Sequence, residues 1–292
     1  MADLSSDILV SAIVVACNSA ERIAPCLRIL SDEIIRVGGE IIIFDNHSLD
    51  STVKSVSSVT PSAIVIKSEK NIGFAAAVDK ASKSAQGKYL LFLNPDVILD
   101  HGTIKELMDN MADQLSAGAV VARMRNPDSS FQPTCRHFPT IGNIFFSRGS
   151  ILSLLGWDQD DKYTLGDFSQ AAEVPAASAT CMLIERDFFI SIGGFDSRFF
   201  LFMEDTDLCL RIRQAGRKIY FIPGAGGVHF WGGSSDISPT MRSWCHHVSV
   251  WRYFLKHYPN GFSVFLLPIA LIVNFVSRAI IGSKRKRQKF HP

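Results

Sequence analysis

The run KYLLFLN, residues 88–94, is followed at once by Pro95 and Asp96, so an apolar segment ends in an acidic turn. Three similar runs precede it, namely LVSAIVVA (9–16), EIIIFD (40–45) and AIVIK (63–67). Short apolar runs rich in β-branched residues are typical of buried strands. The amphipathic segments between them, residues 19–37, 51–59 and 75–84, are predicted to be helices. This alternation predicts an α/β fold with a mostly parallel sheet flanked by helices.

Polar side chains follow three of these strands. Asn18 follows the first run, Asp45 and Asn46 close the second, and Asn94 and Asp96 close the fourth. Open α/β sheets bind ligands at the carboxyl ends of their strands, so three such endings favour a shared polar crevice. Asp and Asn are also common in turns and helix caps, and for the residues after Asp45 this alternative stays open.

The composition narrows the class of protein. The chain has 292 residues, is 47% hydrophobic, and carries 30 basic against 28 acidic residues. It can therefore bury the core of one large domain with an appendage, and its charge balance gives no indication of a nucleic-acid partner. The six cysteines form no CxxC pair, which favours reduced thiols over a disulfide frame or a zinc site. The first apolar run is too short to span a bilayer and lacks preceding basic residues, so we expect a buried strand rather than a signal peptide.

Two groups of carboxylates are candidates for chemistry. Asp96 follows a buried strand, where a carboxylate is costly to desolvate unless hydrogen bonds or a cation such as Mg²⁺ or Mn²⁺ compensate it. A simple Asn-Pro-Asp turn is the alternative.

Glu204 and Asp205 lie among aromatic residues, and a partly desolvated pair of this kind suits a general base. The alternative is that acids in this segment only favour the N-terminus of a helix over 205–215, and for Asp207 helix capping is the preferred interpretation.

The remaining central segments are less informative. Proline and glycine break residues 118–178, which predicts loops and short strands over the site. Residues 218–223, KIYFIP, are predicted to form the last strand, with a glycine-rich stretch and His229 beyond it. This histidine suits a metal ligand, a base or a structural role, and lone histidines are most often structural.

The C-terminal part has a different character. Residues 240–258 show helical spacing of large apolar side chains, and residues 262–281 are apolar almost throughout before a basic run over 284–289. The length suits a bilayer span, whereas Pro268, Asn274 and Arg278 make an interfacial helix an equal alternative. We therefore expect a domain over 1–239 and a membrane-associating helical appendage over 240–292, with a buried C-terminal helix as the competing interpretation.

Six segments in this order resemble the inverting glycosyltransferases of family 2. They are VSAIVVACNSAE, EIIIFDNHSLDST, EKNIGFAAAVDKA, YLLFLNPDV, GGFDSRFFLFMEDTDLCLRIRQAG and VHFWGGSS, within residues 8–258. The resemblance implies the GT-A fold, which is Rossmann-like, and a nucleotide-diphosphate sugar as the donor.

The resemblance also implies roles for particular residues. Asp45 would hydrogen-bond the nucleobase, with Asn18 and Asn71 near the nucleoside and Gly73 and Phe74 lining the pocket. Asn94 and Asp96 would lie at the donor diphosphate, and Asp96 with His229 would bind Mg²⁺ or Mn²⁺. Asp205, paired with Glu204, would take the proton of the acceptor hydroxyl in a single displacement that inverts the sugar configuration. Asn94 departs from the family's first acid, which leaves one carboxylate for the metal.

Within the family, Asn-Pro-Asp and the string NPDSSFQPTCRHFPT (126–140) look most like bacterial rhamnosyltransferases of cell-surface polysaccharide synthesis. This implies dTDP-L-rhamnose as donor, with a UDP-sugar as the alternative, and a lipid-linked saccharide as acceptor at the cytoplasmic face of the inner membrane. Ala179 and Thr180 replace the Gly-Ala that is common in relatives, on the acceptor side. A sugar nucleotidyltransferase is disfavoured because residues 16–19 are neither basic nor glycine-rich. An inactive scaffold of the same fold is the non-enzyme alternative, which the retained carboxylates disfavour.

Overall fold

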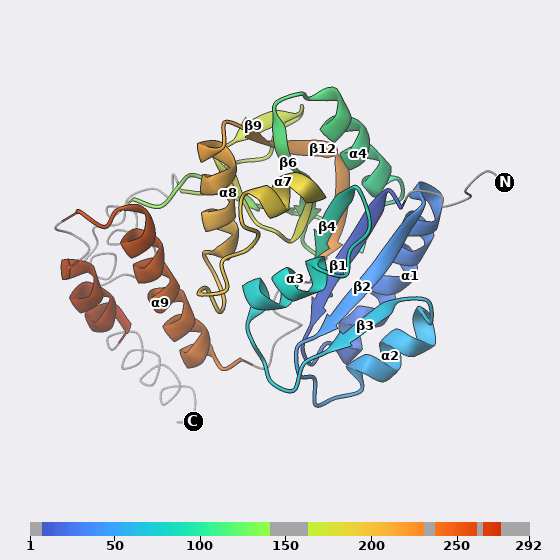
Figure 1. Ribbon diagram of the computed structural model, residues 1–292, viewed down its shortest axis with the longest axis horizontal. Coiled ribbons are helices and arrows are strands. Elements are labelled where there is room, and N and C mark those ends of the chain that lie inside the picture. Colours follow the sequence, from blue (N-terminus) through green and yellow to red (C-terminus); the bar gives the residue numbers. More distant parts are fainter. Residues whose placement is uncertain (1–7, 141–162, 231–236, 262–264, 276–292) are drawn as a thin grey trace.

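The computed structural model describes residues 8–140, 163–230, 237–261 and 265–275. Its first four predicted strands are confirmed as one parallel array in the order β3-β2-β1-β4 (Figure 1). Their bounds are β1 Val10–Ala16, β2 Gly39–Asp45, β3 Ile64–Lys67 and β4 Tyr89–Leu93. The carboxyl ends of these strands therefore meet at one edge, with β1 flanked by β2 and β4 where the strand order reverses.

The other half of the sheet is mixed, so the prediction of a mostly parallel sheet is wrong there. The path continues as β11-β6-β12-β5, through β11 Cys181–Glu185, β6 Ala117–Arg125, β12 Lys218–His229 and β5 Val97–Leu99. β11 runs antiparallel to both β4 and β6. The chain enters β11 from the edge where β4 ends, since Asn94 N–H donates to the carbonyl of Thr180. β11 must then run away from that edge.

Short strands complete the fold. β7 Phe131–Gln132 pairs with β6, and β9 Ala172–Val174 pairs with β12. β8 Cys135–Arg136 and β10 Ala176–Ala177 form a separate two-stranded sheet.

The expectation that residues 118–178 hold only loops and short strands is wrong for β6, a nine-residue strand inside the sheet. Gly118 does not break this strand. A Cβ at Gly118 would lie 2.5 Å from Ile212 Cγ2, so the glycine allows helix α8 to pack closely on the strand. A small residue therefore marks close packing here rather than a turn.

The last strand is also longer than predicted. β12 continues through the glycine-rich stretch, with an irregular register between Ile222 and Gly226, so His229 ends the strand instead of lying beyond it. A Cβ at Gly227 would lie 2.7 Å from the carbonyl oxygen of Ile98, and the glycine permits the close approach of β5.

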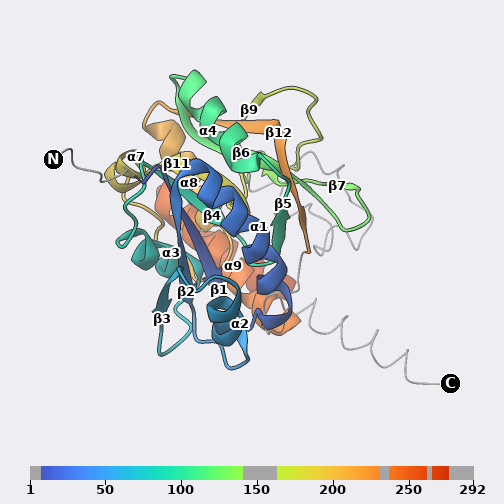
Figure 2. The same cartoon turned by 90° about the vertical axis from the view of Figure 1, so that its right-hand side faces the viewer.

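Helices cover both faces of the sheet (Figure 2). α1 Ala20–Val37, α2 Thr52–Val59 and α4 Thr103–Asp113 contribute to one apolar cluster. α3 Phe74–Ser82, α7 Arg186–Ser191, α8 Glu204–Gln214 and α9 Pro239–His257 contribute to the other. The helices predicted over 19–37, 51–59, 75–84, 205–215 and 240–258 are confirmed within one or two residues.

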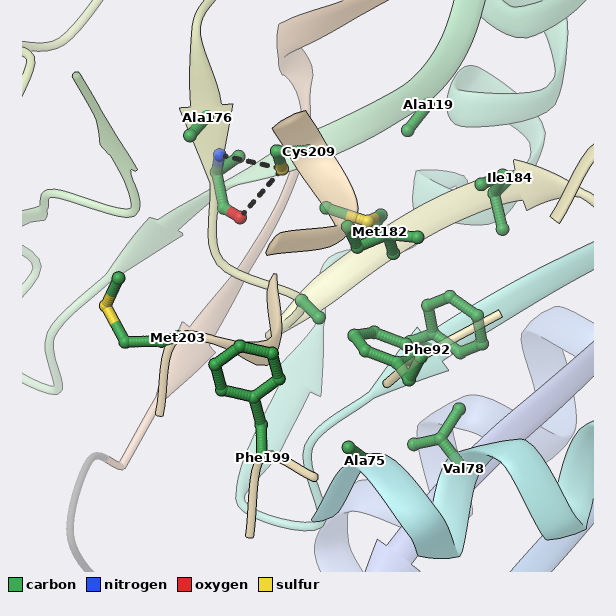
Figure 3. Close-up of a cluster of buried hydrophobic side chains, with 14 of the residues drawn as sticks. Ala75, Val78, Phe92, Ala119, Ala176, Met182, Ile184, Phe199, Met203 and Cys209 are labelled. Atoms are coloured by element: carbon green, nitrogen blue, oxygen red, sulfur yellow. Dashed lines mark hydrogen bonds between the residues drawn. The ribbon is translucent and has the colours of Figure 1, made fainter. Parts of the chain in front are cut away.

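Alternation along the strands builds these two clusters. In β4, Leu91 and Leu93 face the α1 side, whereas Leu90 and Phe92 face the α3 side, and all are buried. Figure 3 shows Phe92 close to Ala75 and Val78 of α3, in the cluster that also contains Met182 of β11. Such continuous apolar strands need cover on both faces, which the two helical layers supply.

The C-terminal part packs on the α8 side. Val250, Tyr253 and Phe254 of α9 are buried, and in Figure 1 α9 lies beside α8. Residues 265–275 are helical and bury Leu267 and Leu271 in the same cluster. Within the residues that the structure describes, no helix has both the length and the apolar character needed to cross a membrane. The remainder of the predicted apolar segment, 262–264 and 276–281, and the basic run over 284–289 lie outside the described residues.

Candidate active site

One pocket of about 790 Å³ lies where the parallel strands end, a size usual for small-molecule sites. Most of the predicted site residues line it, from four separate parts of the chain. These are Asn71, Gly73, Phe74, Asn94, Asp96, Glu204, Asp205 and His229. The fold therefore brings the two predicted carboxylate groups into one cavity.

Asn18 and Asp45 lie beside the pocket, at the ends of β1 and β2, and are not among its lining residues. Asn18 has a positive φ of 48° and accepts a hydrogen bond from Leu49 N–H at 2.7 Å. Asp45 Oδ1 accepts from Ser48 N–H at 3.3 Å. Both side chains brace the loop after β2, and their predicted contacts with a nucleoside stay predictions.

Asn46, for which turn chemistry was left open, lines the pocket and holds the loop before α3. Its Oδ1 accepts from Ile72 N–H at 2.8 Å, and its Nδ2 donates to Asn71 Oδ1 at 3.0 Å. The loop then reaches Gly73, whose φ is 85° and where a Cβ would lie 2.5 Å from the carbonyl oxygen of Phe200. Only glycine fits there without strain, which places the N-terminus of α3 against the pocket.

Asp96 and His229 lie together because β5 pairs with the end of β12, with His229 opposite Val97. Both side chains are buried, and His229 Nε2 lies 3.2 Å from Asp96 Oδ1. This carboxylate oxygen has no hydrogen-bond partner among the described residues. Asn94 Nδ2 lies 3.5 Å from the same histidine nitrogen.

This arrangement fits a divalent cation. A buried carboxylate oxygen without a hydrogen-bond donor is costly unless a positive charge compensates it. Within the described ranges no group of three or more His, Cys, Asp or Glu side chains could hold a metal ion. Asp96 and His229 would therefore supply two ligands, and Mg²⁺ or Mn²⁺ commonly completes its shell with substrate phosphates and water.

Glu204 and Asp205 begin α8, after a turn in which Phe202 and Met203 have φ values of 69° and 66°. Positive φ is unfavourable for such large residues, and this backbone is typical of constrained functional turns. Glu204 is buried and its Oε2 has no hydrogen-bond partner in the described structure. Burial, and secondarily the charge of Asp205, raises the pKa of Glu204 to about 8, so this carboxyl is mostly protonated at neutral pH.

Asp205 has a different environment. Arg136 of β8 donates from Nη2 to Asp205 Oδ1, and Thr206 N–H donates to the same oxygen at 2.6 Å. Burial by itself would lower the pKa of the Arg136 guanidinium. The neighbouring Asp205 carboxylate outweighs this effect of burial and raises the pKa. The contacts made by Asp205 in the described structure converge on Oδ1. These hydrogen bonds anchor one oxygen of the Asp205 carboxylate.

Asp207 lies in the first turn of α8, as the sequence interpretation expects, but α8 has no side-chain cap hydrogen bond and this carboxylate binds other partners. Its fully buried carboxylate lies 2.6 Å from Lys256 Nζ and 2.7 Å from His257 Nε2, both on α9. Arg211 also pairs with it at 2.8 Å. Asp207 therefore ties α9 to the helix that begins with Glu204 and Asp205.

Several residues of the pocket were not predicted as site residues. Arg136 and Gln132 come from the polar string over 126–140, whose proline-separated polar residues were the available signal. Arg242 and His246 come from α9 and also line the pocket. Helical spacing on α9 indicated only packing, so position in space alone identifies these two.

Comparison with known proteins identifies a family for this chain. Residues 11–193 match the family model described as glycosyl transferase family 2. The chain is 28% identical over 230 residues to the N-acetylglucosaminyl-diphospho-decaprenol L-rhamnosyltransferase of Mycobacterium tuberculosis, covering 73% of each chain. It is 26% identical over 156 residues to the rhamnosyltransferase WbbL of Escherichia coli, covering 53% of this chain and 57% of that relative.

Among solved structures, the mannosyltransferase PcManGT of Pyrobaculum calidifontis, in complex with GDP-Man and Mn²⁺, superposes with a TM-score of 0.59. The match covers 94% of this chain and 76% of that one at 15% sequence identity. At this identity the likeness shows the fold alone.

Proposed function

The chain belongs to glycosyl transferase family 2, and we propose that it transfers L-rhamnose from dTDP-L-rhamnose to a lipid-linked saccharide in bacterial cell-surface polysaccharide synthesis. Asp96 and Asp205, more than one hundred residues apart in the sequence, line one pocket at the carboxyl ends of the strands, and this observation carries the proposal. The rhamnosyl donor is supported by two relatives that are both named rhamnosyltransferases.

Asp205 is the base in this proposal. Its anchored Oδ1 fixes the side chain, and Oδ2 accepts the acceptor hydroxyl proton as the oxygen attacks the anomeric carbon. Glu204, protonated at neutral pH, contributes no second negative charge beside it. A single displacement of this kind inverts the configuration at the transferred sugar.

Asp96 and His229 would hold Mg²⁺ or Mn²⁺ beside the donor diphosphate. When bound, such a cation stabilises the negative charge of the departing nucleoside diphosphate. Asp96 Oδ1, which has no hydrogen-bond partner in the described structure, supports this role. The Mn²⁺ in the complex of the mannosyltransferase PcManGT supports it as well. Asn71, Gly73 and Phe74 would contact the donor, with Asn18 and Asp45 at the nucleoside end.

The acceptor would approach from the α9 side. Arg242 and His246 of α9 line the pocket and suit the diphosphate of a lipid-linked saccharide.

The helix over residues 265–275 buries Leu267 and Leu271 but exposes Phe265, Leu266, Ile269, Ile272 and Val273. A helix with one packed face and one exposed apolar face suits an interfacial position. Residues 240–292 would therefore form an appendage to the domain over 1–239 and associate with the cytoplasmic face of the inner membrane.

A panel of donors tests this function. The purified protein would be mixed with dTDP-, UDP-, GDP- and CMP-sugars, with and without Mn²⁺, and thermal shift and nucleotide release would be measured beside Asp96→Ala. We expect dTDP-L-rhamnose to give the largest stabilisation and acceptor-dependent release, both lost in the variant. A response to UDP-sugars would retain the mechanism and overturn the rhamnosyl donor. No response to any sugar nucleotide in folded protein would favour an inactive scaffold.

A further inference from the structure

The hairpin over residues 125–132 joins β6 to β7 and lies against the end of β12 that carries His229. β6 runs parallel to β12 as far as Val228, and β7 pairs antiparallel with β6, Met124 opposite Gln132. Gln132 thereby reaches the histidine, with its Nε2 3.5 Å from the His229 carbonyl oxygen. The proposed function assigns this hairpin no role.

Hydrogen bonds within the hairpin fix the orientation of each amide. Ser130 Oγ donates to Asp128 Oδ1 at 2.5 Å, and hydrogen bonds from Ser130 hold the pKa of Asp128 below its usual value. The hydroxyl proton is thus committed to a carboxylate, and Ser130 Oγ accepts from Asn126 Nδ2 at 2.9 Å. Asn126 must then turn its Oδ1 toward Gln132.

The chain of hydrogen bonds continues from Asn126 through Gln132 to His229. Gln132 Nε2 donates to Asn126 Oδ1 at 2.8 Å, so Gln132 turns its Oε1 to His229 Nδ1 at 2.6 Å. A carbonyl oxygen only accepts, and Nδ1 must therefore carry a proton. The other ring nitrogen, Nε2, is directed at Asp96 Oδ1, 3.2 Å away.

We propose that Gln132 is a positioning residue that keeps a proton on His229 Nδ1 and so presents Nε2 to the cation held with Asp96. The inference rests on the proposed function for the cation and goes beyond it, because it assigns the hairpin a task. A ligating histidine commonly gives its second N–H to a neighbouring acceptor, and loss of such a partner lowers metal affinity about 10–100-fold.

Two readouts test the inference. Nitrogen-15 NMR of histidine-labelled protein, assigned with His229→Gln, should show protonated Nδ1 at His229 in the wild type and partial loss of that proton in Gln132→Leu. Mn²⁺ binding in the presence of dTDP, with UDP in a parallel titration, should weaken about tenfold in Gln132→Leu by electron paramagnetic resonance. Gln132→Glu keeps an acceptor toward Nδ1 and should largely restore Mn²⁺ binding.

Gln86→Leu is the matched control, because Gln86 precedes β4 at the opposite end from Asp96. It should bind Mn²⁺ as the wild type does. Unprotonated Nδ1 in the wild type, or equal Mn²⁺ affinity in Gln132→Leu and wild type, would overturn the inference. If the wild type binds no Mn²⁺ with either nucleotide, the cation role in the proposed function fails, and the inference fails with it even if Nδ1 is protonated.

Discussion

Glu204 and Asp205 are adjacent carboxyls with opposite surroundings. Glu204 is buried without a hydrogen bond to Oε2 in the described structure, whereas Arg136 and Thr206 donate to Asp205 Oδ1. Neighbouring acids whose environments differ in this way commonly take different roles. The proposed function accordingly assigns the base to Asp205, beside a Glu204 carboxyl that its burial keeps neutral.

Asp205→Asn should lower kcat about 10²–10⁴-fold, the usual contribution of a general base. Asn retains an oxygen that can accept from Arg136, but the guanidinium loses its counter-charge, so the thermal midpoint should fall while the affinity for dTDP changes little. Initial rates with donor and acceptor, together with thermal unfolding, check this outcome. A kcat within tenfold of the wild type would show that another group takes the proton.

Glu204→Gln should change how stability depends on pH. The unfolded chain releases the Glu204 proton near its usual pKa of 4.5, whereas the folded protein keeps it up to about 8. Stability is thus lost as pH rises through this window. The thermal midpoint of Glu204→Gln, relative to the wild type, should increase from pH 5 to pH 8. A difference that is constant or falls would contradict the assigned protonation.

At this scale the sequence predicted the acids but not their partners. Asp96, Glu204 and Asp205 were candidates because carboxylates there lie beside apolar runs, and the resemblance to family 2 rather than the local pattern assigned their roles. Arg136 lies 69 residues from Asp205, and a contact over that separation has no local pattern. The pairing depends on β8 and β10 forming their own small sheet next to α8.

At the scale of elements, α8 connects Asp205, the proposed base, to α9. Asp207 lies two residues after Asp205 and is buried between Lys256, His257 and Arg211. The burial that opposes ionisation is outweighed by these partners, so the pKa of Asp207 is lowered. The position of α9, which carries Arg242 and His246, is therefore linked to the helix that carries the base.

Lys256→Met should destabilise the protein by about 1–3 kcal/mol, because one cation next to a buried carboxylate is removed while two partners stay. Urea unfolding of the full chain measures this. Lys218→Met is the control, since Lys218 pairs with Glu173 at 2.8 Å on the surface and should cost below about 1 kcal/mol. Equal losses in the two variants would contradict a structural role for the Asp207 contacts.

The elements themselves were predicted unequally. The parallel strands and their crossover helices follow from local hydrophobic periodicity, which a single sequence displays directly. β6 and the second half of β12 were missed because glycines there permit close packing of Ile212 and β5, while the same residues in isolation favour turns. The direction of β11 depends on the chain re-entering the sheet beside the end of β4, which no local pattern shows.

For the whole molecule, the described part of the C-terminus presents an apolar surface. Phe265, Ile269 and Ile272 are 71%, 61% and 55% exposed on the helix over 265–275. This helix also contacts α9, where Asn274 Nδ2 lies 3.1 Å from His247 Nε2. The pocket and the proposed membrane-facing helix are thus joined through α9.

The combined substitution Phe265→Glu, Ile269→Glu and Ile272→Glu should reduce binding to phosphatidylglycerol vesicles at least tenfold, because it places charge on the apolar face. Sedimentation with vesicles measures the bound fraction. The control combines Ile35→Glu, Leu115→Glu and Ile190→Glu, which change exposed apolar residues elsewhere on the surface. A membrane role for this helix would be contradicted if vesicle binding fell equally in the two triple variants, or if it fell in neither of them.

Truncation after Tyr258 should likewise release the protein from membranes.

The anomeric configuration of the product is the most direct test of a single displacement assisted by Asp205. The full-length protein, dTDP-L-rhamnose, Mn²⁺ and an isoprenoid-diphosphate-linked saccharide would be incubated together, and the new glycosidic linkage would be analysed by NMR. We expect a rhamnosylated acceptor whose anomeric configuration is opposite to that of the donor, and no such product with Asp205→Asn. Retained configuration, or transfer undiminished in that variant, would contradict a single displacement assisted by Asp205.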